Sequence, residues 1–352
     1  MKQIAHNIYI HVPFCMSKCN YCAFFSRACS APDWGQYTND ICAEIVSWSN
    51  RMGRIDVPTI FFGGGTPSLM PVECFDRIMN TIRHNFNTDV CQEVTLESNP
   101  KTLNKQKLTD FINAGMSRLS VGIQSLNDEK LKFLGRRHSV SDALDLLSVA
   151  QNIGVNVSAD FIYGLPNETV DDVIDLCHQI NKLGLLHCSL YELTIEENSV
   201  FGKMNLNMPT NSEMAKMYSA IATHLDLPRY EVSNYATDGY HCLHNENIWD
   251  GDAYIGIGLG GAGRVNIDGQ WYEQMGAGQH WAKMSGDARS VEKIITGMRT
   301  VRGCRLTDDV KNAIDMNWVS KKPELVQIQD GRIKVTDAGM LILDDVLLKL
   351  VR

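Results

Sequence analysis

Residues 8–25 read IYIHVPFCMSKCNYCAFF, with cysteines at Cys15, Cys19 and Cys22. The apolar alternation over residues 8–12 predicts a β-strand, so the cysteines lie on the loop that follows it. Spacings of four and three residues let a short loop wrap three thiolates around one inorganic centre. Four-iron clusters are held by cysteine runs of this kind. Because a fourth cysteine at similar spacing is missing, one iron would stay open to an outside ligand.

Structural zinc is the alternative interpretation of the same cysteines. Zinc takes four closed ligands, and His11 or Cys29 could supply the fourth. Zinc sites, however, usually come as two C-x2-C pairs separated by a longer segment, and no second pair is present. The spacing therefore favours an iron–sulfur cluster.

Composition limits the protein class. A chain of 352 residues, 44% hydrophobic, predicts one large domain plus a smaller one. The net charge of −8 argues against a broad nucleic-acid surface. No apolar run approaches the ~18 residues that a membrane span needs, and the N-terminus has no signal-peptide pattern. We therefore expect a cytoplasmic protein whose eleven cysteines are free thiols or metal ligands.

Six strand–helix units in series predict an α/β fold with a parallel sheet. The expected strands are residues 8–12, 59–62, 94–96, 118–123, 155–162 and 188–194. Six units are too few for an eight-fold barrel, so we expect a partial (β/α)6 barrel over residues 1–200. Residues 201–352 should form a smaller α+β region. Its hairpin turns at Asp330-Gly331, and its helix–hairpin–helix order resembles a winged helix that packs against the core.

Ligands of parallel α/β barrels bind at the carboxyl ends of the strands. Glycines at such an end let the backbone approach a ligand closely, and carboxylates in apolar strands need a cationic or hydrogen-bonding partner. The residues that this rule selects are Gly64, Gly65, Thr66, Glu97, Gln124 and Asp160.

The C-x3-C-x2-C loop and the GGGTP turn together resemble the radical S-adenosylmethionine (SAM) superfamily. The resemblance implies a partial barrel and a [4Fe-4S] cluster on Cys15, Cys19 and Cys22. It also implies SAM on the open iron, cleaved to a 5′-deoxyadenosyl radical, and an electron donor for the cluster. The SAM pocket would comprise the six residues above together with Tyr9, Tyr21 and Arg136. Arg136 would form a bidentate pair with the SAM carboxylate.

Further motifs, namely YIHVPFC, ESNP, VGIQS, GRRH and DFIYGLP, resemble the branch that contains oxygen-independent coproporphyrinogen III oxidase and the haem chaperone HemW family. Two features favour the chaperone family. Phe24 replaces the oxidase's fourth cysteine, and the first strand begins by Ile8, without the oxidase's N-terminal extension. The function implied is haem binding and transfer to an acceptor protein. The alternative is oxidative decarboxylation of coproporphyrinogen III.

The stretch His244–Trp249, HNENIW, resembles the HNxxYW haem motif of that family. Imidazole is a common axial ligand of haem iron, so we predict that His244 contributes to haem binding. Two departures stand against the motif: Ile248 replaces its tyrosine, and a later GPGAHS-like stretch, at residues 258–263, lacks its histidine. An ordinary hydrogen-bonded histidine is the alternative role for His244, and His241 and Cys242 are rival ligands.

Overall fold

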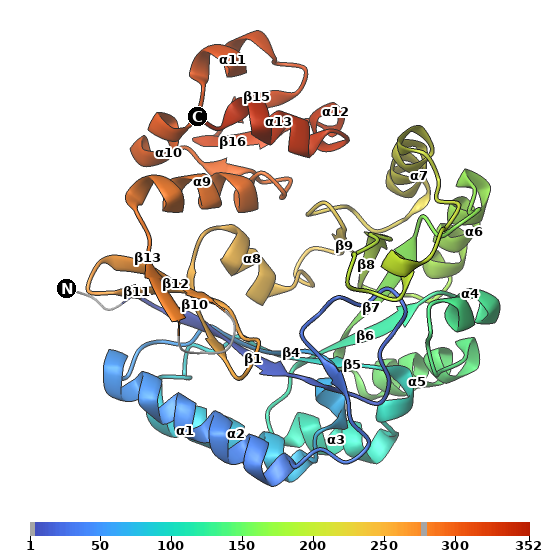
Figure 1. Cartoon of the computed structure of the whole chain (residues 1–352), viewed down its shortest axis with the longest axis vertical. Coiled ribbons are helices and arrows are strands. Elements are labelled where there is room, and N and C mark those ends of the chain that lie inside the picture. The colour runs from blue at the N-terminus through green and yellow to red at the C-terminus, as the bar shows by residue number, and fades with distance from the viewer. Residues whose placement is uncertain (1–3, 276–279) are drawn as a thin grey trace.

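The computed structural model describes residues 4–275 and 280–352. Its main sheet runs in the order β13-β12-β11-β10-β1-β4-β5-β6-β7-β8-β9 (Figure 1). The parallel strands of the barrel are β1 (His6–Val12), β4 (Thr59–Gly64), β5 (Glu93–Ser98), β6 (Arg118–Gln124), β7 (Asn156–Tyr163) and β8 (His187–Glu192). This order confirms the expected six-unit partial barrel.

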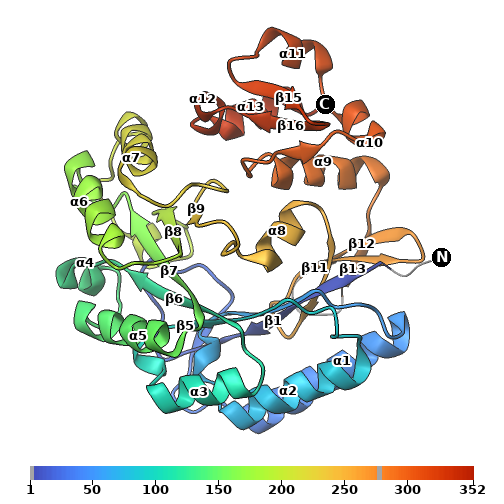
Figure 2. The ribbon, with the colours of Figure 1, turned by 180° about the vertical axis from the view of Figure 1, so that it is seen from behind.

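Helices cover the outer, convex side of the sheet (Figures 1 and 2). They are α1 (Trp34–Met52), α2 (Val72–Asn85), α3 (Lys105–Asn113), α4 (Asp128–Phe133), α5 (Val140–Ile153), α6 (Val170–Asn181) and α7 (Asn211–His224). The main core lies between these helices and the sheet. In β1, Ile8, Ile10 and Val12 are fully buried in it. Since successive strand residues point to opposite faces, Tyr9 and His11 face the inside of the barrel, here called the lumen.

The sheet continues beyond residue 200. β9 (Asn234–Ala236) pairs antiparallel with β8, and β10 (Ala253–Ile257) pairs parallel with β1 at the opposite edge. β11 (Gly263–Ile267), β12 (Gln270–Met275) and β13 (His280–Lys283) extend that edge. The predicted division at residue 200 therefore falls within the elements of one sheet.

Residues beyond 285 form a unit with its own core, built around Ile294, Val310 and Ile333. Its elements are α9 (Gly286–Gly297), β14 (Cys304–Arg305), α10 (Asp308–Ala313), α11 (Met316–Lys321), β15 (Val326–Gln329), β16 (Arg332–Val335), α12 (Asp337–Met340) and α13 (Leu343–Leu350). β15 and β16 form the predicted hairpin, with positive φ at both Asp330 and Gly331. In the described part of the chain no helix has the length and apolar character of a membrane span.

No pattern in the sequence predicted a helix inside the barrel. The short helix α8 (Leu243–Trp249) lies on the concave side of the sheet (Figures 1 and 2). It contacts β4 on one side and α9 of the C-terminal unit on the other. The stretch that resembles a haem motif thus links the barrel to that unit.

Candidate cofactor site

The cysteine loop is fixed by backbone hydrogen bonds. β2 (Phe14–Cys15) pairs with β3 (Arg27–Ala28), and the Cys22 amide donates to the Cys19 carbonyl over 3.2 Å. Lys18 Nζ donates to the carbonyls of Phe24 and Ser26, at 3.1 and 3.4 Å, and joins the two halves of the loop. All three predicted cluster cysteines are half-buried. Burial raises the pKa of the Cys22 thiol, and the nearby Lys18 charge opposes that rise.

His11, considered above as a zinc ligand, has both ring nitrogens engaged. Its Nε2 lies 2.7 Å from the Phe25 carbonyl, which can only accept, so Nε2 carries the proton. Its Nδ1 then accepts from the Tyr9 hydroxyl at 3.1 Å. A metal at His11 would have to break one of these bonds. In the described residues no three His, Cys, Asp or Glu side chains are grouped to hold one metal ion. A four-iron cluster makes a different demand, because each of its cysteines binds a different iron.

The glycine turn after β4 lies directly against the cysteine loop. The amide of Gly65 donates to the Val12 carbonyl at 2.7 Å, and that of Thr66 to the Phe14 carbonyl at 2.8 Å. A Cβ on Gly65 would lie 2.6 Å from the Phe14 oxygen and 3.0 Å from Cys15 Sγ. Gly64 has φ +111°, a conformation that suits glycine. These glycines are therefore required where the turn meets the predicted cluster.

Glu97 is a carboxylate that is hydrogen-bonded to this turn. Its Oε2 accepts from the Gly64 amide at 3.0 Å. Burial, followed by the charge of Asp160, raises the Glu97 pKa to about 8. Asp160 accepts from the Ser120 hydroxyl at 2.9 Å, and burial raises its pKa as well. Two carboxylates held together in a lumen fit an ammonium group and hydroxyls, because such a ligand would relieve their repulsion and their lost hydration.

Arg136 brings a positive charge to the same region. Its guanidinium donates to the Gly122 carbonyl at 2.6 Å and to Cys19 Sγ at 3.4 Å, and also to the Asn99 side chain. Beside it, Gln124 follows a bulge in β6 and has φ +73°. The arginine therefore touches a predicted cluster ligand as well as the predicted SAM pocket.

Two tyrosines from the sequence prediction lie next to residues of this region. Tyr21 pairs with Arg136, and burial raises its pKa more than that pairing lowers it. Tyr9 is stacked on Phe61, with ring centroids 6.1 Å apart. Burial, and after it the charge of Glu97, raises the Tyr9 pKa, so its hydroxyl stays protonated.

His244 lies at the opposite end of the lumen, beside the amino end of β4. Its ring is 2% exposed and lies 5.0 Å from the Phe61 ring. Thr59 donates its single hydroxyl proton to Asn7 at 2.7 Å, so His244 Nδ1–H must donate to Thr59, at 2.8 Å. Nε2 therefore carries a lone pair, and it has no hydrogen-bond partner in the described structure. Burial lowers the His244 pKa to about 3, so the imidazole is neutral.

The amino end of α8 is held by Glu93, a buried residue at the start of β5. Its carboxylate accepts from the amides of Leu243 and His244, both at 3.1 Å, and from Cys242 Sγ at 3.6 Å. Cys242 is buried, and burial raises its pKa to about 12. This rival haem ligand is therefore a protonated thiol already in use as a donor.

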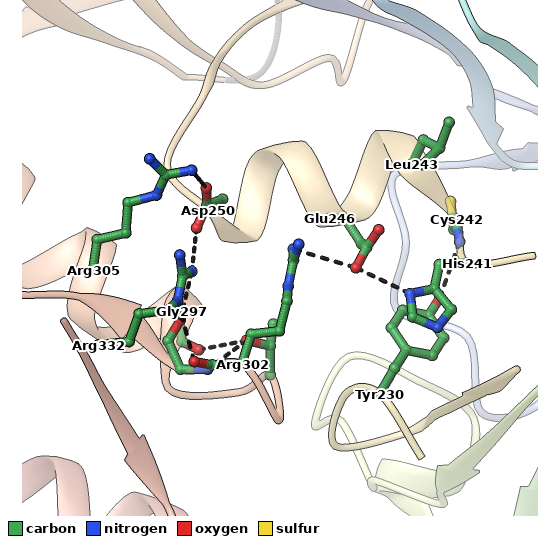
Figure 3. A network of polar contacts seen from close by, with 12 residues as sticks. Tyr230, His241, Cys242, Leu243, Glu246, Asp250, Gly297, Arg302, Arg305 and Arg332 are labelled. Atoms are coloured by element: carbon green, nitrogen blue, oxygen red, sulfur yellow. Dashed lines mark hydrogen bonds and ion pairs between the residues drawn. The ribbon is translucent and has the colours of Figure 1, made fainter. Parts of the chain in front are cut away.

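The other side of α8 faces the C-terminal unit (Figure 3). Glu246 forms an ion pair with Arg302 at 3.2 Å and accepts a hydrogen bond from His241 Nδ1 at 3.1 Å. His241 is stacked on Tyr230, with centroids 4.0 Å apart. At the end of the helix, Asp250 pairs with Arg305 at 3.0 Å and with Arg332. These pairs join the candidate haem stretch to the C-terminal unit.

Similar known proteins match most of the chain. Residues 9–180 match the radical SAM superfamily. The haem chaperone HemW of Escherichia coli strain K12 is 34% identical over 270 residues, covering 74% of this chain and 70% of the relative. HemW of Haemophilus influenzae is 33% identical over the same shares. The chain belongs to the HemW family of radical SAM proteins. That membership confirms the family expected from the sequence, and it implies SAM and a [4Fe-4S] cluster.

One solved structure shares the HemW-family fold over nearly the whole chain. Coproporphyrinogen III oxidase (HemN) from Escherichia coli, described as a radical SAM enzyme, superposes with a TM-score of 0.80 at 18% identity. The match covers 99% of this chain and 90% of HemN. The shared architecture therefore includes the C-terminal unit as well as the barrel.

Sequence reasoning missed the roles of three residues of the site. Asn99 bonds both Arg136 and the Thr66 hydroxyl, the latter at 3.0 Å. His11 fixes Tyr9, and Glu93 holds α8. Asn99 stood in the quoted ESNP motif directly after a strand, so the strand-end rule could have found it. Nothing local in the sequence marks Glu93, because its partners lie some 150 residues away.

Proposed function

We propose that this protein is a radical SAM haem chaperone: it holds a [4Fe-4S] cluster and SAM in the barrel, binds haem, and passes haem to an acceptor protein. The observation that carries the proposal is the meeting of the cysteine loop, the glycine turn and the Glu97 carboxylate in one lumen, in a chain of the HemW family. A bound cluster supplies one-electron chemistry to SAM. The residues described below position SAM and hold its charges.

In this proposal Cys15, Cys19 and Cys22 hold the cluster, and Gly64, Gly65 and Thr66 receive the amino end of SAM. Glu97 pairs with the SAM ammonium, Asp160 and Gln124 bind its hydroxyls, and Tyr9 and Tyr21 flank it. Arg136 already lies 3.4 Å from Cys19 Sγ. It therefore serves two negative groups, the cluster thiolate and the SAM carboxylate, and arginine's five N–H donors suit that double role.

Removal of single cysteines tests the cluster. We expect Cys15→Ala, Cys19→Ala and Cys22→Ala each to abolish the roughly four irons per chain of a cysteine-held cubane. Cys29→Ala is the matched control, since Cys29 is also half-buried and its amide bonds the Cys15 carbonyl at 2.9 Å. Iron analysis of anaerobically reconstituted protein gives the answer. Loss of iron in Cys29→Ala, with iron retained in Cys22→Ala, would refute the ligand set.

For haem we propose His244 as a ligand, through Nε2. A metal-binding histidine typically donates its other ring N–H to a fixed acceptor, and Nδ1–H of His244 does so to Thr59. The ring is neutral, and its free lone pair has no competing partner among the described residues. Because the ring is buried against Phe61, haem reaches Nε2 only when α8 moves away from β4.

His241 is the more accessible rival, with 23% of its side chain exposed. Haem titrations of wild type, His244→Ala and His241→Ala, followed by the Soret band, separate the two. We expect a changed band or a weaker affinity in His244→Ala and a normal band in His241→Ala. The reverse pattern would assign the ligand to His241, which lies just before α8.

The enzyme alternative has a direct assay. Protein loaded with cluster, SAM and reductant is incubated anaerobically with coproporphyrinogen III. The chaperone proposal expects no protoporphyrinogen, and its formation at catalytic turnover would favour the oxidase. Transfer to an acceptor protein belongs to the same proposal, since the relatives are named haem chaperones. A cytoplasmic location is proposed with it.

A further inference from the structure

Three buried polar atoms in the lumen have no hydrogen-bond partner among the described residues. They are Thr95 Oγ1 on β5, Arg118 Nε on β6 and His244 Nε2 on α8. Thr95 is fully buried, and Arg118 is 3% exposed. Buried polar groups are hydrogen-bonded in the great majority of cases, because an unpaired one has lost its water without gaining a partner. The three atoms therefore need an explanation.

The register of the strands places these atoms close together. Phe61 on β4 pairs with Thr95, and Thr95 pairs with Arg118. Their side chains point into the lumen, because alternate residues of these strands, such as Leu96, lie in the main core. The His244 ring lies against Phe61, with 5.0 Å between the ring centroids. The unpaired atoms thus share one level of the lumen.

Arg118 carries a charge that no hydrogen bond to a carboxylate balances in the described structure. The Glu93 carboxylate lies 3.9 Å from Arg118 Nε, beyond hydrogen-bond distance. Its oxygens already accept from the first amides of α8. Burial first, and then the charge of Arg118, lowers the His244 pKa, so the guanidinium is within electrostatic reach of that ring. Its charge and donors are available to an anionic group in the lumen.

The lumen has room for such a group. Leu190 on β8 lies in the main core, so the next residue, Tyr191, faces the lumen. Tyr191 is nevertheless 41% exposed, whereas a lumen filled by side chains would cover its ring. At the amino end of the strands α8 closes the lumen through Glu93. The movement of α8 that exposes His244 opens the same end to Arg118.

We infer that Arg118 and Thr95 bind a propionate of the haem whose iron His244 holds. The inference rests on the proposed function in one respect, namely that this chain binds haem. Haem is an apolar ring with two carboxylates on its rim, so a buried haem site needs a cation and hydrogen-bond donors for a carboxylate. A guanidinium suits this role because its planar donors can bond both carboxylate oxygens. The Thr95 hydroxyl supplies a further donor.

Two arginines serve opposite ends of β6. Arg118 is the first residue of the strand, and Arg136 donates to the Gly122 carbonyl near its last residue. Arg136 is the proposed partner of the SAM carboxylate, at the end that meets the cysteine loop. Arg118 lies at the end that α8 closes. Haem and SAM therefore do not compete for one cation.

The test compares haem with haem dimethyl ester, in which both carboxylates are blocked. Each is titrated in the same dilute detergent into the full chain with its cluster reconstituted, and the Soret band is followed. Arg118→Met removes the charge, Arg118→Lys keeps it, and Thr95→Val removes only the hydroxyl. Arg54→Met is the matched control, because Arg54 is exposed in the loop after α1.

We expect the wild type to bind haem about tenfold or more tightly than the ester, the scale of a charged hydrogen bond. Arg118→Met should lose this preference by weakening the binding of haem alone, and Thr95→Val should reduce it. Arg118→Lys should keep part of the preference, and Arg54→Met all of it. Iron content and SAM affinity should match wild type in Thr95→Val and Arg118→Lys, because these residues lie far from the cysteine loop.

Three results would overturn the inference. Equal affinity of the wild type for haem and its ester would mean that the propionates are not recognised. A preference that survives in Arg118→Met would place their partner elsewhere. Equal weakening of both porphyrins in Arg118→Met would show that the arginine only supports the fold.

Thr95→Val decides the question if Arg118→Met does not retain its iron. An unchanged preference for haem in Thr95→Val would then overturn the inference, and a reduced preference would support it. Failure of the proposed function is distinguishable, because the wild type would then bind neither porphyrin saturably.

Discussion

Replacement of Glu97 by glutamine should make the ligand-free protein more stable at neutral pH and less sensitive to pH. Burial and the charge of Asp160 raise the Glu97 pKa from its ordinary value of 4.5 to about 8. A carboxyl whose pKa is higher in the folded state favours folding when protonated. Its contribution is complete below the unfolded pKa and is lost as pH rises toward 8. Glutamine is neutral throughout and can still accept from the Gly64 amide.

The size of this effect follows from linkage. Each pH unit between the two pKa values changes the free energy of unfolding by about 1.4 kcal/mol. Between pH 5.5 and 7.5 the free energy of unfolding of the wild type should fall by about 2–3 kcal/mol through this group alone. Water that hydrates the ionised carboxylate in the lumen reduces this loss. Glu97→Gln should not show this loss, so its free energy of unfolding should exceed that of the wild type by a growing margin.

Urea unfolding of cluster-free protein at pH 5.5, 6.5 and 7.5 measures this margin. Glu129→Gln, on the exposed first turn of α4, controls for the loss of one negative charge. The reasoning is refuted if the difference between Glu97→Gln and wild type stays constant with pH. It is also refuted if the variant is less stable at pH 7.5, because Glu97 would then be a stabilising, ionised carboxylate.

Three further predictions concern the same lumen. Gly65→Ala should lower the iron content after reconstitution, because its Cβ would push against the Phe14 carbonyl and Cys15; iron analysis that matches wild type would contradict this. Arg136→Ala should weaken SAM binding by about 1–3 kcal/mol, the scale of an unmade charged hydrogen bond, measured by calorimetry on reconstituted protein. Glu93→Gln should destabilise the fold by about 1–3 kcal/mol and speed amide exchange in α8, because Leu243 and His244 lose their shared carboxylate; unchanged exchange would show that the helix is held elsewhere.

The barrel was predictable because its signals are local. Each strand ends in a short motif, and the register of β1 with β4 places His11 beside Gly63 and Val12 beside Gly64. That register brings the cysteine loop to the glycine turn, as the strand-end rule requires. Glu97 and Asp160 followed from the same rule.

The placement of α8 at the end of the lumen near the start of β4 was not predictable. α8 is only seven residues long and polar, so it has no periodic apolar face to reveal it. Its placement depends on partners far away in the chain, such as Glu93 and Thr59. The parallel pairing of β10 with β1 is likewise a long-range contact, set by the side chains around His6 and Ala253 and not by any turn. Local patterns carry no information about such contacts.

The most direct test of the central claim is a haem titration of anaerobically purified protein, with cluster and SAM in place, followed by absorbance. The chaperone proposal predicts the brown colour of an iron–sulfur cluster, a Soret band that saturates near one haem per chain, and loss of that band when a competing haem-binding protein is added. Protein that holds its cluster but gives no saturable Soret band would contradict the proposal.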